Sequence, residues 1–167
     1  DLSGAEVELV NSIGRELKLK KSLKKSFPYY DFIFIDCPPS LGLLTVNALV
    51  AANSYLIPMQ CEYFAMEGLS NFLNVINVVQ NSLNPDLGLE GIVLTMFDSR
   101  NNLSRQVSEE IKAHFPEGIF NSVIPRNVRL SECPSFGKPV MLYDPASSGS
   151  RAYTKLAKEF VVKYPKA

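Results

Sequence analysis

The chain alternates between short apolar runs and longer segments whose apolar residues recur every three or four positions. Strands and helices that alternate in this way are typical of βαβ units, so the expected fold class is α/β, with a mostly parallel sheet and helices on both faces. The expected strands are residues 31–36, 54–59, 89–97 and 119–124. The expected helices are one before residue 28 and those over 43–52, 69–83, 103–115 and 153–162.

The first apolar run is the most informative, because four bulky apolar residues, 32–35, end abruptly at an acid, Asp36. Such a run predicts a strand that is buried on both faces in a parallel sheet. Open α/β sheets bind their ligands at the carboxyl ends of the strands. In nucleotide hydrolases an acid at this place is the Walker B residue, which holds Mg²⁺ directly or through water. The alternative is an aspartate that only caps a helix.

The other predicted strands also end in polar loops. Gln60 and Glu62 follow the second strand, Asp98 and Arg100 follow the third, and a Pro-Arg-Asn turn at 125–127 follows the fourth. Because parallel strands share one carboxyl edge, the four loops are expected to converge on a crevice. The pattern alone therefore predicts an α/β ligand-binding or catalytic domain, with a nucleotide as the expected ligand.

Composition further limits the possible domain organisation and ligands. A chain of 167 residues, without repeats or linkers, fits a single α/β domain over 1–167. Its 17 basic and 17 acidic residues cancel, so any anion must bind to a local patch. The lysine-rich end of the first helix is one possible patch, but a solvated helix end is the favoured explanation for it. Three separated cysteines indicate neither disulfides nor zinc, and no apolar stretch is long enough to span a membrane.

Four long segments closely resemble the ParA/Soj family of chromosome and plasmid partitioning ATPases, which are relatives of MinD. They are residues 30–48 (YDFIFIDCPPSLGLLTVNA), 57–69 (IPMQCEYFAMEGL), 94–104 (LTMFDSRNNLS) and 123–139 (VIPRNVRLSECPSFGKP). They occur in the family's order and spacing. The resemblance implies a P-loop NTPase-like fold and an ATPase that dimerises around two ATP molecules. It also implies non-specific binding of double-stranded DNA and a ParB/Spo0J-like partner that stimulates hydrolysis.

The resemblance also assigns site residues. Asp36 matches the Walker B acid associated with Mg²⁺, and the Pro-Pro loop after it matches switch II. Two loops match those that hold the adenine edge of ATP, although the second could be a simple turn: Met96, Phe97 and Asp98, and Pro125, Arg126 and Asn127. The amide of Asn127 can both donate to and accept from a base edge.

Arg100 and Arg129 match the DNA-contacting arginines of Soj-like proteins, and the alternative for each is an ordinary surface arginine. Guanidinium groups in exposed loops suit phosphate oxygens and give salt-sensitive, sequence-independent contacts. Relatives often carry more arginine where this chain has residues 141–149. This departure predicts either weaker DNA binding or a shift of DNA to Lys138, Arg151 and Lys155.

The chain contains no Lys-Gly-Gly-x-Gly-Lys-Thr segment, the phosphate loop that opens this family. That loop supplies the backbone N–H groups and lysines that hold the triphosphate. The fold is therefore expected to be incomplete at the N-terminus, and the chain alone is expected to be inactive. The hypotheses are the C-terminal part of a cytoplasmic, nucleoid-associated partitioning ATPase, or an inactive DNA- or partner-binding module. A MinD-like membrane role is disfavoured, because the C-terminus carries no membrane helix.

Overall fold

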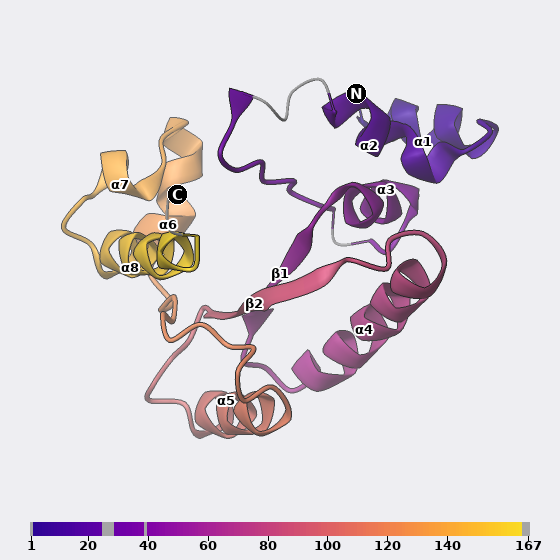
Figure 1. Ribbon diagram of the computed structural model, residues 1–167. Helices are drawn as coiled ribbons and strands as arrows, with labels where there is room; N and C mark the ends of the chain where they lie inside the picture. The colour runs from indigo at the N-terminus through magenta and orange to yellow at the C-terminus, as the bar shows by residue number, and fades with distance from the viewer. Residues whose placement is uncertain (1, 25–28, 39, 165–167) are drawn as a thin grey trace. The chain divides into compact units, whose positions relative to one another are not determined.

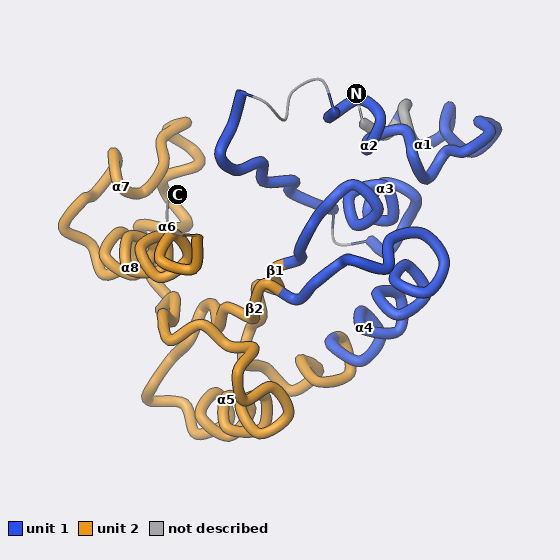
Figure 2. Tube along the Cα trace, viewed as in Figure 1, with its two compact units in different colours: residues 1–55, 69–89 blue, residues 56–68, 90–167 orange. Residues whose placement is uncertain are grey.

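The computed structural model describes residues 2–24, 29–38 and 40–164 (Figure 1). Lys25 of the lysine-rich segment and Pro39 of the predicted Pro-Pro turn lie outside these ranges. Two compact units make up the chain: residues 1–55 with 69–89, and residues 56–68 with 90–167 (Figure 2). Each is described by itself below, as unit 1 and unit 2, and the single domain over 1–167 stays a prediction.

Unit 1 is mainly helical. It contains the helices α1 (Leu2–Val10), η1 (Arg15–Leu17), α2 (Lys18–Leu23), α3 (Leu43–Ala51) and most of α4 (Ala65–Ser82). Its core consists of side chains from α3, α4 and the turn that follows α4: Leu49, Val50, Ile76, Val79 and Leu87. Asn84 closes this core, because its buried amide donates to the carbonyls of Leu49 and Ala52 at 2.9 and 2.8 Å. The helices predicted over 43–52 and 69–83 are thus confirmed, although α4 begins four residues earlier than expected. The single helix predicted before residue 28 is instead divided into α1, η1 and α2.

The prediction of a buried strand over residues 31–36 is wrong. These residues have no regular secondary structure, and all except Ile35 are exposed. Phe34, for example, is 74% exposed. A strand buried on both faces needs hydrogen-bonded neighbours on each side. Residues 31–36 belong to no strand or bridge in the described part of the chain, so their apolar pattern is not expressed as a strand.

Two of the predicted strands form and pair with each other. They are β1 (Ser54–Gln60) and β2 (Gly88–Thr95), joined through α4 (Figure 1). Pro58 lies inside β1 and does not end it, and β1 is only partly buried, whereas β2 has four consecutive buried residues at 91–94. The α/β class with parallel pairing is confirmed. Two isolated bridges, one on β2 and one just after it, are both parallel.

The fourth predicted strand, 119–124, runs beside β2 but is not a continuous strand. Phe120 N donates to Ile92 O at 3.0 Å, and Ile124 N donates to Leu94 O at 2.8 Å. Between these two hydrogen bonds the ladder is interrupted, because Asn121 N and Ser122 N donate to the carboxylate of Glu159 at 2.6 and 2.8 Å. A side chain from the last helix therefore takes the place of a strand neighbour.

The rest of unit 2 consists of helices. They are α5 (Asn102–His114), α6 (Val128–Glu132), η3 (Cys133–Phe136), α7 (Val140–Tyr143) and α8 (Ser148–Val162). The segment between residues 128 and 143, for which no helix was predicted, thus contains three short helices, and α8 begins five residues before its predicted start. The unit's core is built on Val93, Phe120 and Ile124, with Leu130, Leu156 and Phe160 packed against it.

Glu159 should make the stability of unit 2 depend on acid. Partial burial alone would raise the pKa of this carboxyl, but hydrogen bonds from Ser122 and Asn121 outweigh it and lower the pKa below its ordinary value of 4.5. Stability from the ionised form is therefore present above pH 4.5 and lost as the pH falls through the folded-state pKa. We expect Glu159→Gln to lower the free energy of unfolding by about 1–3 kcal/mol at neutral pH.

Urea denaturation of both proteins across the acid range measures this effect. The gap between them should close as the pH falls through the lowered folded-state pKa of Glu159, because both side chains are then neutral. A gap that stays constant with pH would contradict an electrostatic role for Glu159. The matched control is Glu109→Gln, an exposed glutamate on α5.

Candidate functional site

Three loops of unit 2 surround an open hollow of about 750 Å³. They are the loop after β1, the loop after β2 with the start of α5, and the turn that contains Arg126. Three of the four loops that were expected to converge thus line one hollow. Its lining residues are Gln60, Cys61, Glu62, Tyr63, Phe64, Ala65, Met96, Asp98, Asn101, Leu103, Ser104 and Arg126. The size is within the usual range for small-molecule sites.

Backbone hydrogen bonds hold two of these loops together. Phe97 N donates to Ile124 O, and Arg126 N donates to Phe97 O, each at 3.1 Å. Phe97 and Pro125 form a parallel bridge at the same place. Met96 turns the chain at the end of β2 with a φ of 49°, a conformation that is uncommon for a residue other than glycine. The two predicted adenine-edge loops are therefore neighbours.

The carboxylate of Asp98 accepts hydrogen bonds from within its own loop. It accepts from Arg100 N and Nε at 3.0 Å and from Arg100 Nη2 at 2.9 Å. These bonds hold the pKa of Asp98 at about 2, well below its usual value, and they raise the pKa of Arg100. Asp98 is thus ionised over the physiological range, and the charge of Arg100, predicted to contact DNA, already has a carboxylate partner.

A second ion pair joins the first loop to the third. Arg126 Nη2 lies 3.6 Å from Glu62 Oε1, and both side chains are well exposed. Exposed pairs of this kind add little stability, so this one is free to rearrange around a ligand. Beside Glu62 lie Tyr63 and Phe64, two exposed rings in edge-to-face contact at 5.0 Å. No role was predicted for these two rings from the sequence.

The side-chain amide of Asn127 already forms hydrogen bonds within the fold. Its Oδ1 accepts from Arg129 N at 2.8 Å and so caps the start of α6, while its Nδ2 donates to Ser148 Oγ at 2.7 Å. The amide keeps one further N–H and one further lone pair for a base edge. An Asn directly before a helix is a common N-cap, so the sequence alone could have indicated this role for Asn127.

The second predicted DNA-contacting residue, Arg129, is held by two acids. Its Nη1 lies 2.8 Å from Glu132 Oε2, and its Nε lies 3.3 Å from Asp144 Oδ2. The hydrogen bond with Glu132 is the main reason that the pKa of Arg129 is raised. Arg100 and Arg129 are therefore both exposed, as expected, and both neutralised by neighbouring carboxylates.

Asp36, the predicted Walker B acid, lies in unit 1 with its residue exposed. In the described ranges no cluster of three or more metal-binding side chains is present, so these ranges provide no metal cage made of protein ligands alone. A single exposed carboxylate fits Mg²⁺, which usually binds one or two protein acids and completes its shell with water and phosphate oxygens.

The cysteines show no sign of reactive chemistry. Cys61 and Cys133 are buried, and Cys37 is exposed next to Asp36. Desolvation raises the pKa of both Cys37 and Cys61, and the Asp36 carboxylate raises that of Cys37 further. A raised pKa disfavours the nucleophilic thiolate at both positions.

Comparisons with known proteins agree with the sequence pattern. The family model described as an AAA domain matches residues 1–89. The chain is 58% identical over 158 residues to the sporulation initiation inhibitor protein Soj of Bacillus subtilis, covering 95% of this chain and 62% of Soj. It is also 58% identical over 161 residues to the chromosome partitioning protein ParA of Myxococcus xanthus, covering 96% of this chain and 57% of ParA.

Among solved structures, cobyrinic acid a,c-diamide synthase from Mycobacterium smegmatis is similar, with a TM-score of 0.81 and 36% identity over 99% of this chain and 60% of that one. A second structure of the synthase holds an ATP analogue and magnesium. In the described part of the chain, no helix is both long and apolar enough to cross a membrane. The chain spans about 60% of these proteins and matches the C-terminal portion of the curated relatives. It belongs to the AAA domain family and is homologous to the ParA/Soj partitioning ATPases.

Proposed function

We propose that this chain is the C-terminal part of a ParA/Soj-type ATPase that partitions DNA. The observation that carries the proposal is the hollow of unit 2, because two of the loops that line it are those assigned to the adenine edge of ATP. The identity of 58% to Soj and ParA, against 36% to the diamide synthase, favours partitioning over amide synthesis.

In the complete protein, Asp36 would hold Mg²⁺ through its carboxylate, and the residues around Met96 and Asn127 would contact the nucleotide. Met96 contributes an apolar surface at the hollow, and Asn127 offers its remaining donor and acceptor. Bound ATP would promote a homodimer that associates with double-stranded DNA. A ParB/Spo0J-like protein would then stimulate hydrolysis in the cytoplasm, at the nucleoid.

A chimera tests the ATPase assignment. We would join the N-terminal segment of Bacillus subtilis Soj that precedes the matched residues to this chain, restoring the length of Soj. The chimera should hydrolyse ATP in the presence of Mg²⁺, because the added segment supplies a phosphate loop and this chain supplies the acid and the adenine-edge loops. Phosphate release measures the rate.

The isolated 167-residue chain is the control for the chimera. It should neither hydrolyse ATP nor bind it tightly, because its sequence has no phosphate loop. Micromolar binding of ATP·Mg²⁺ to the isolated chain in equilibrium dialysis would contradict this expectation. A folded chimera without ATPase activity would favour the second candidate function, a catalytically inactive DNA- or partner-binding module of the same fold.

A further inference from the structure

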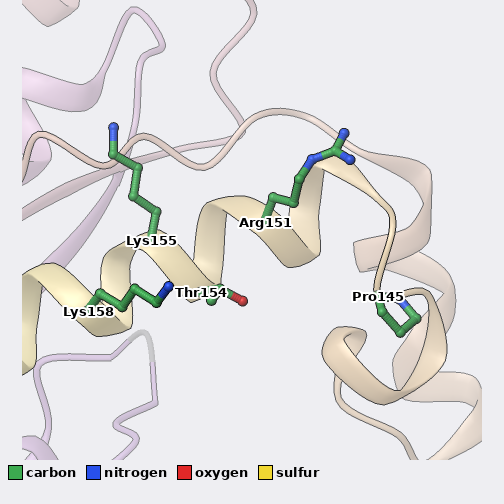
Figure 3. A pocket seen from close by; sticks show the side chains of 5 residues that line it. All are labelled: Pro145, Arg151, Thr154, Lys155 and Lys158. Atoms are coloured by element: carbon green, nitrogen blue, oxygen red, sulfur yellow. The ribbon is translucent and has the colours of Figure 1, made fainter.

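The hollow between the three loops of unit 2, about 750 Å³ in volume, contains two carboxylates, and each is paired with an arginine. Asp98 is bound by Arg100, and Glu62 lies 3.6 Å from Arg126. A second hollow, of about 390 Å³, lies against α8 and has no acid among the described residues that line it (Figure 3). Those residues are Pro145, Arg151, Thr154, Lys155 and Lys158. Of these two hollows, only the first offers carboxylate acceptors to a ligand.

Arg100 leaves the Asp98 carboxylate with little capacity for a ligand. A carboxylate has about four lone-pair sites, two on each oxygen. Asp98 Oδ1 accepts from the backbone N–H and from Nε of Arg100, both at 3.0 Å, and Oδ2 accepts from Nη2 at 2.9 Å. These hydrogen bonds fill both sites of Oδ1 and one site of Oδ2. One site on Oδ2 remains for a donor of the ligand.

Adenine and guanine differ in the donors that they offer to such a carboxylate. Adenine offers its 6-amino group, and the ring nitrogen beside it, N1, is an acceptor. Guanine offers two neighbouring donors, N1–H and the 2-amino group, which fit a free carboxylate with one donor on each oxygen. With one free site, Asp98 can accept from the amino group of adenine but not from both donors of guanine.

The position of Asp98 is set by the backbone of its loop. Its carbonyl oxygen accepts from Asn101 N at 3.0 Å, and Phe97 N donates to Ile124 O at 3.1 Å. Without the guanidinium, the backbone N–H of residue 100 would still bind Oδ1 and keep the carboxylate oriented. One site on Oδ1 and both sites on Oδ2 would then be open to a ligand.

A second cation, Arg126, also acts on Asp98. It lowers the pKa of Asp98, but its effect is the smallest of those that act on this carboxyl, whereas the hydrogen bonds from Arg100 have the largest. Arg126 is also paired with Glu62 at 3.6 Å. Arg100 is therefore the residue that controls access to the Asp98 carboxylate.

We propose that Arg100 makes the base site select adenine over guanine by occupying the Asp98 carboxylate. Arg100 is thus a positioning residue, which acts through Asp98 and does not itself contact the base. The proposal rests on the proposed ATPase function, with this hollow as the base site. It gives Arg100 a role in nucleotide selection, besides the role at DNA that the family resemblance predicts.

The test compares the rates of the Soj chimera with ATP, GTP and inosine triphosphate (ITP), measured as phosphate release without DNA. In Arg100→Ala, the ratio of kcat/KM for GTP to that for ATP should rise by about tenfold or more over the parent chimera. The base of ITP has N1–H but no 2-amino group, so the rise for ITP should be smaller than that for GTP. A loosened or partly unfolded site would lower all three rates without this order.

Two variants are the controls. Arg105→Ala removes the same charge from an exposed arginine of α5 that does not line the hollow, so it should keep the parental ratio of GTP to ATP. Arg100→Ala combined with Asp98→Ala also removes the carboxylate, so the ratio should return toward the parental value. The Arg100 side chain is 89% exposed, so its removal opens no space in the core and should leave circular dichroism unchanged.

A parental ratio of GTP to ATP in an active Arg100→Ala chimera would overturn the proposal and leave the ATPase assignment intact. An equal rise in Arg105→Ala, a rise that persists without Asp98, or a rise for ITP as large as that for GTP would overturn it as well. If Arg100→Ala binds nucleotides without hydrolysing them, equilibrium dialysis with the three nucleotides gives the same ratios.

Two further results separate this inference from the proposed function. Loss of binding of all three nucleotides in Arg100→Ala alone would assign Arg100 to binding itself and would overturn the proposal, while the ATPase assignment stands. A parent chimera that neither hydrolyses ATP nor binds it would overturn the proposed function, and the selection of adenine would fail with it.

Discussion

Asp36→Asn should lower the rate of ATP hydrolysis by the Soj chimera by about 100-fold, a loss typical of removing one charged or hydrogen-bonding group that stabilises a transition state. Asparagine keeps the size of the side chain but carries no negative charge, so it holds Mg²⁺ poorly. Without a positioned cation, the charge that develops on the phosphate oxygens is not neutralised. The measurement is steady-state phosphate release at saturating ATP and Mg²⁺.

The matched control is Asp31→Asn, which makes the same change at an exposed aspartate five residues earlier. It should retain close to full activity. Nucleotide binding measured in EDTA should be similar in both variants, because Asp36 acts through the metal. Equal activity of the two variants would remove the basis for the Walker B assignment. Loss of EDTA-insensitive binding in Asp36→Asn would indicate a structural defect instead.

Gly91→Ala should lower the free energy of unfolding by about 3 kcal/mol. Gly91 lies in β2 with a φ of 154°, and a Cβ placed there would lie 2.5 and 2.8 Å from Cε2 and Cδ2 of Phe120. Phe120 is buried in the core of unit 2, so its ring has little space to move. Overpacking of this kind costs roughly 1–3 kcal/mol, and the strained backbone adds roughly 1–3 kcal/mol.

Urea denaturation measures the change, and Gly88→Ala in the same strand is the control. A Cβ at Gly88 would meet its nearest neighbour, Asn53 O, at 3.9 Å, so this variant should stay within about 0.5 kcal/mol of the parent. Combining Gly91→Ala with Phe120→Leu should cost less than the sum of the two single changes, because the smaller side chain relieves the clash. Additive losses would show that the ring is not the cause.

The strands show how much of a sheet can be predicted from an apolar pattern alone. The pattern correctly located β1 and β2, where each strand pairs with the other. It also predicted strands over 31–36 and 119–124, and neither forms as a continuous strand. A strand depends on neighbours that are distant in sequence, and a local pattern contains no information on them. At 121–122 the carboxylate of Glu159, from a helix far along the chain, binds the backbone instead.

The site residues divide in a similar way. Arg129 and Glu132 lie three residues apart on one short helix, a spacing at which side chains can meet. Arg100 and Asp98 lie two residues apart in a loop, so their pairing depends on the conformation of that loop. The second partner of Arg129 is Asp144, and Asn127 binds Ser148. These contacts link separate elements, and only the folded chain brings them together.

The sequence by itself determined the α/β class, the longer helices α3, α4, α5 and α8, and the family, because these depend on local periodicity and on long motifs in register. It also placed polar residues at the ends of β1 and β2. Only the tertiary structure decided which charges are available. The carboxylates of Asp98, Glu132 and Asp144 neutralise Arg100 and Arg129, and Glu159 turns to Ser122. Arg151, Lys155 and Lys158 of α8 have no ion-pair partner among the described residues, because ion pairing depends on distances that the fold alone sets.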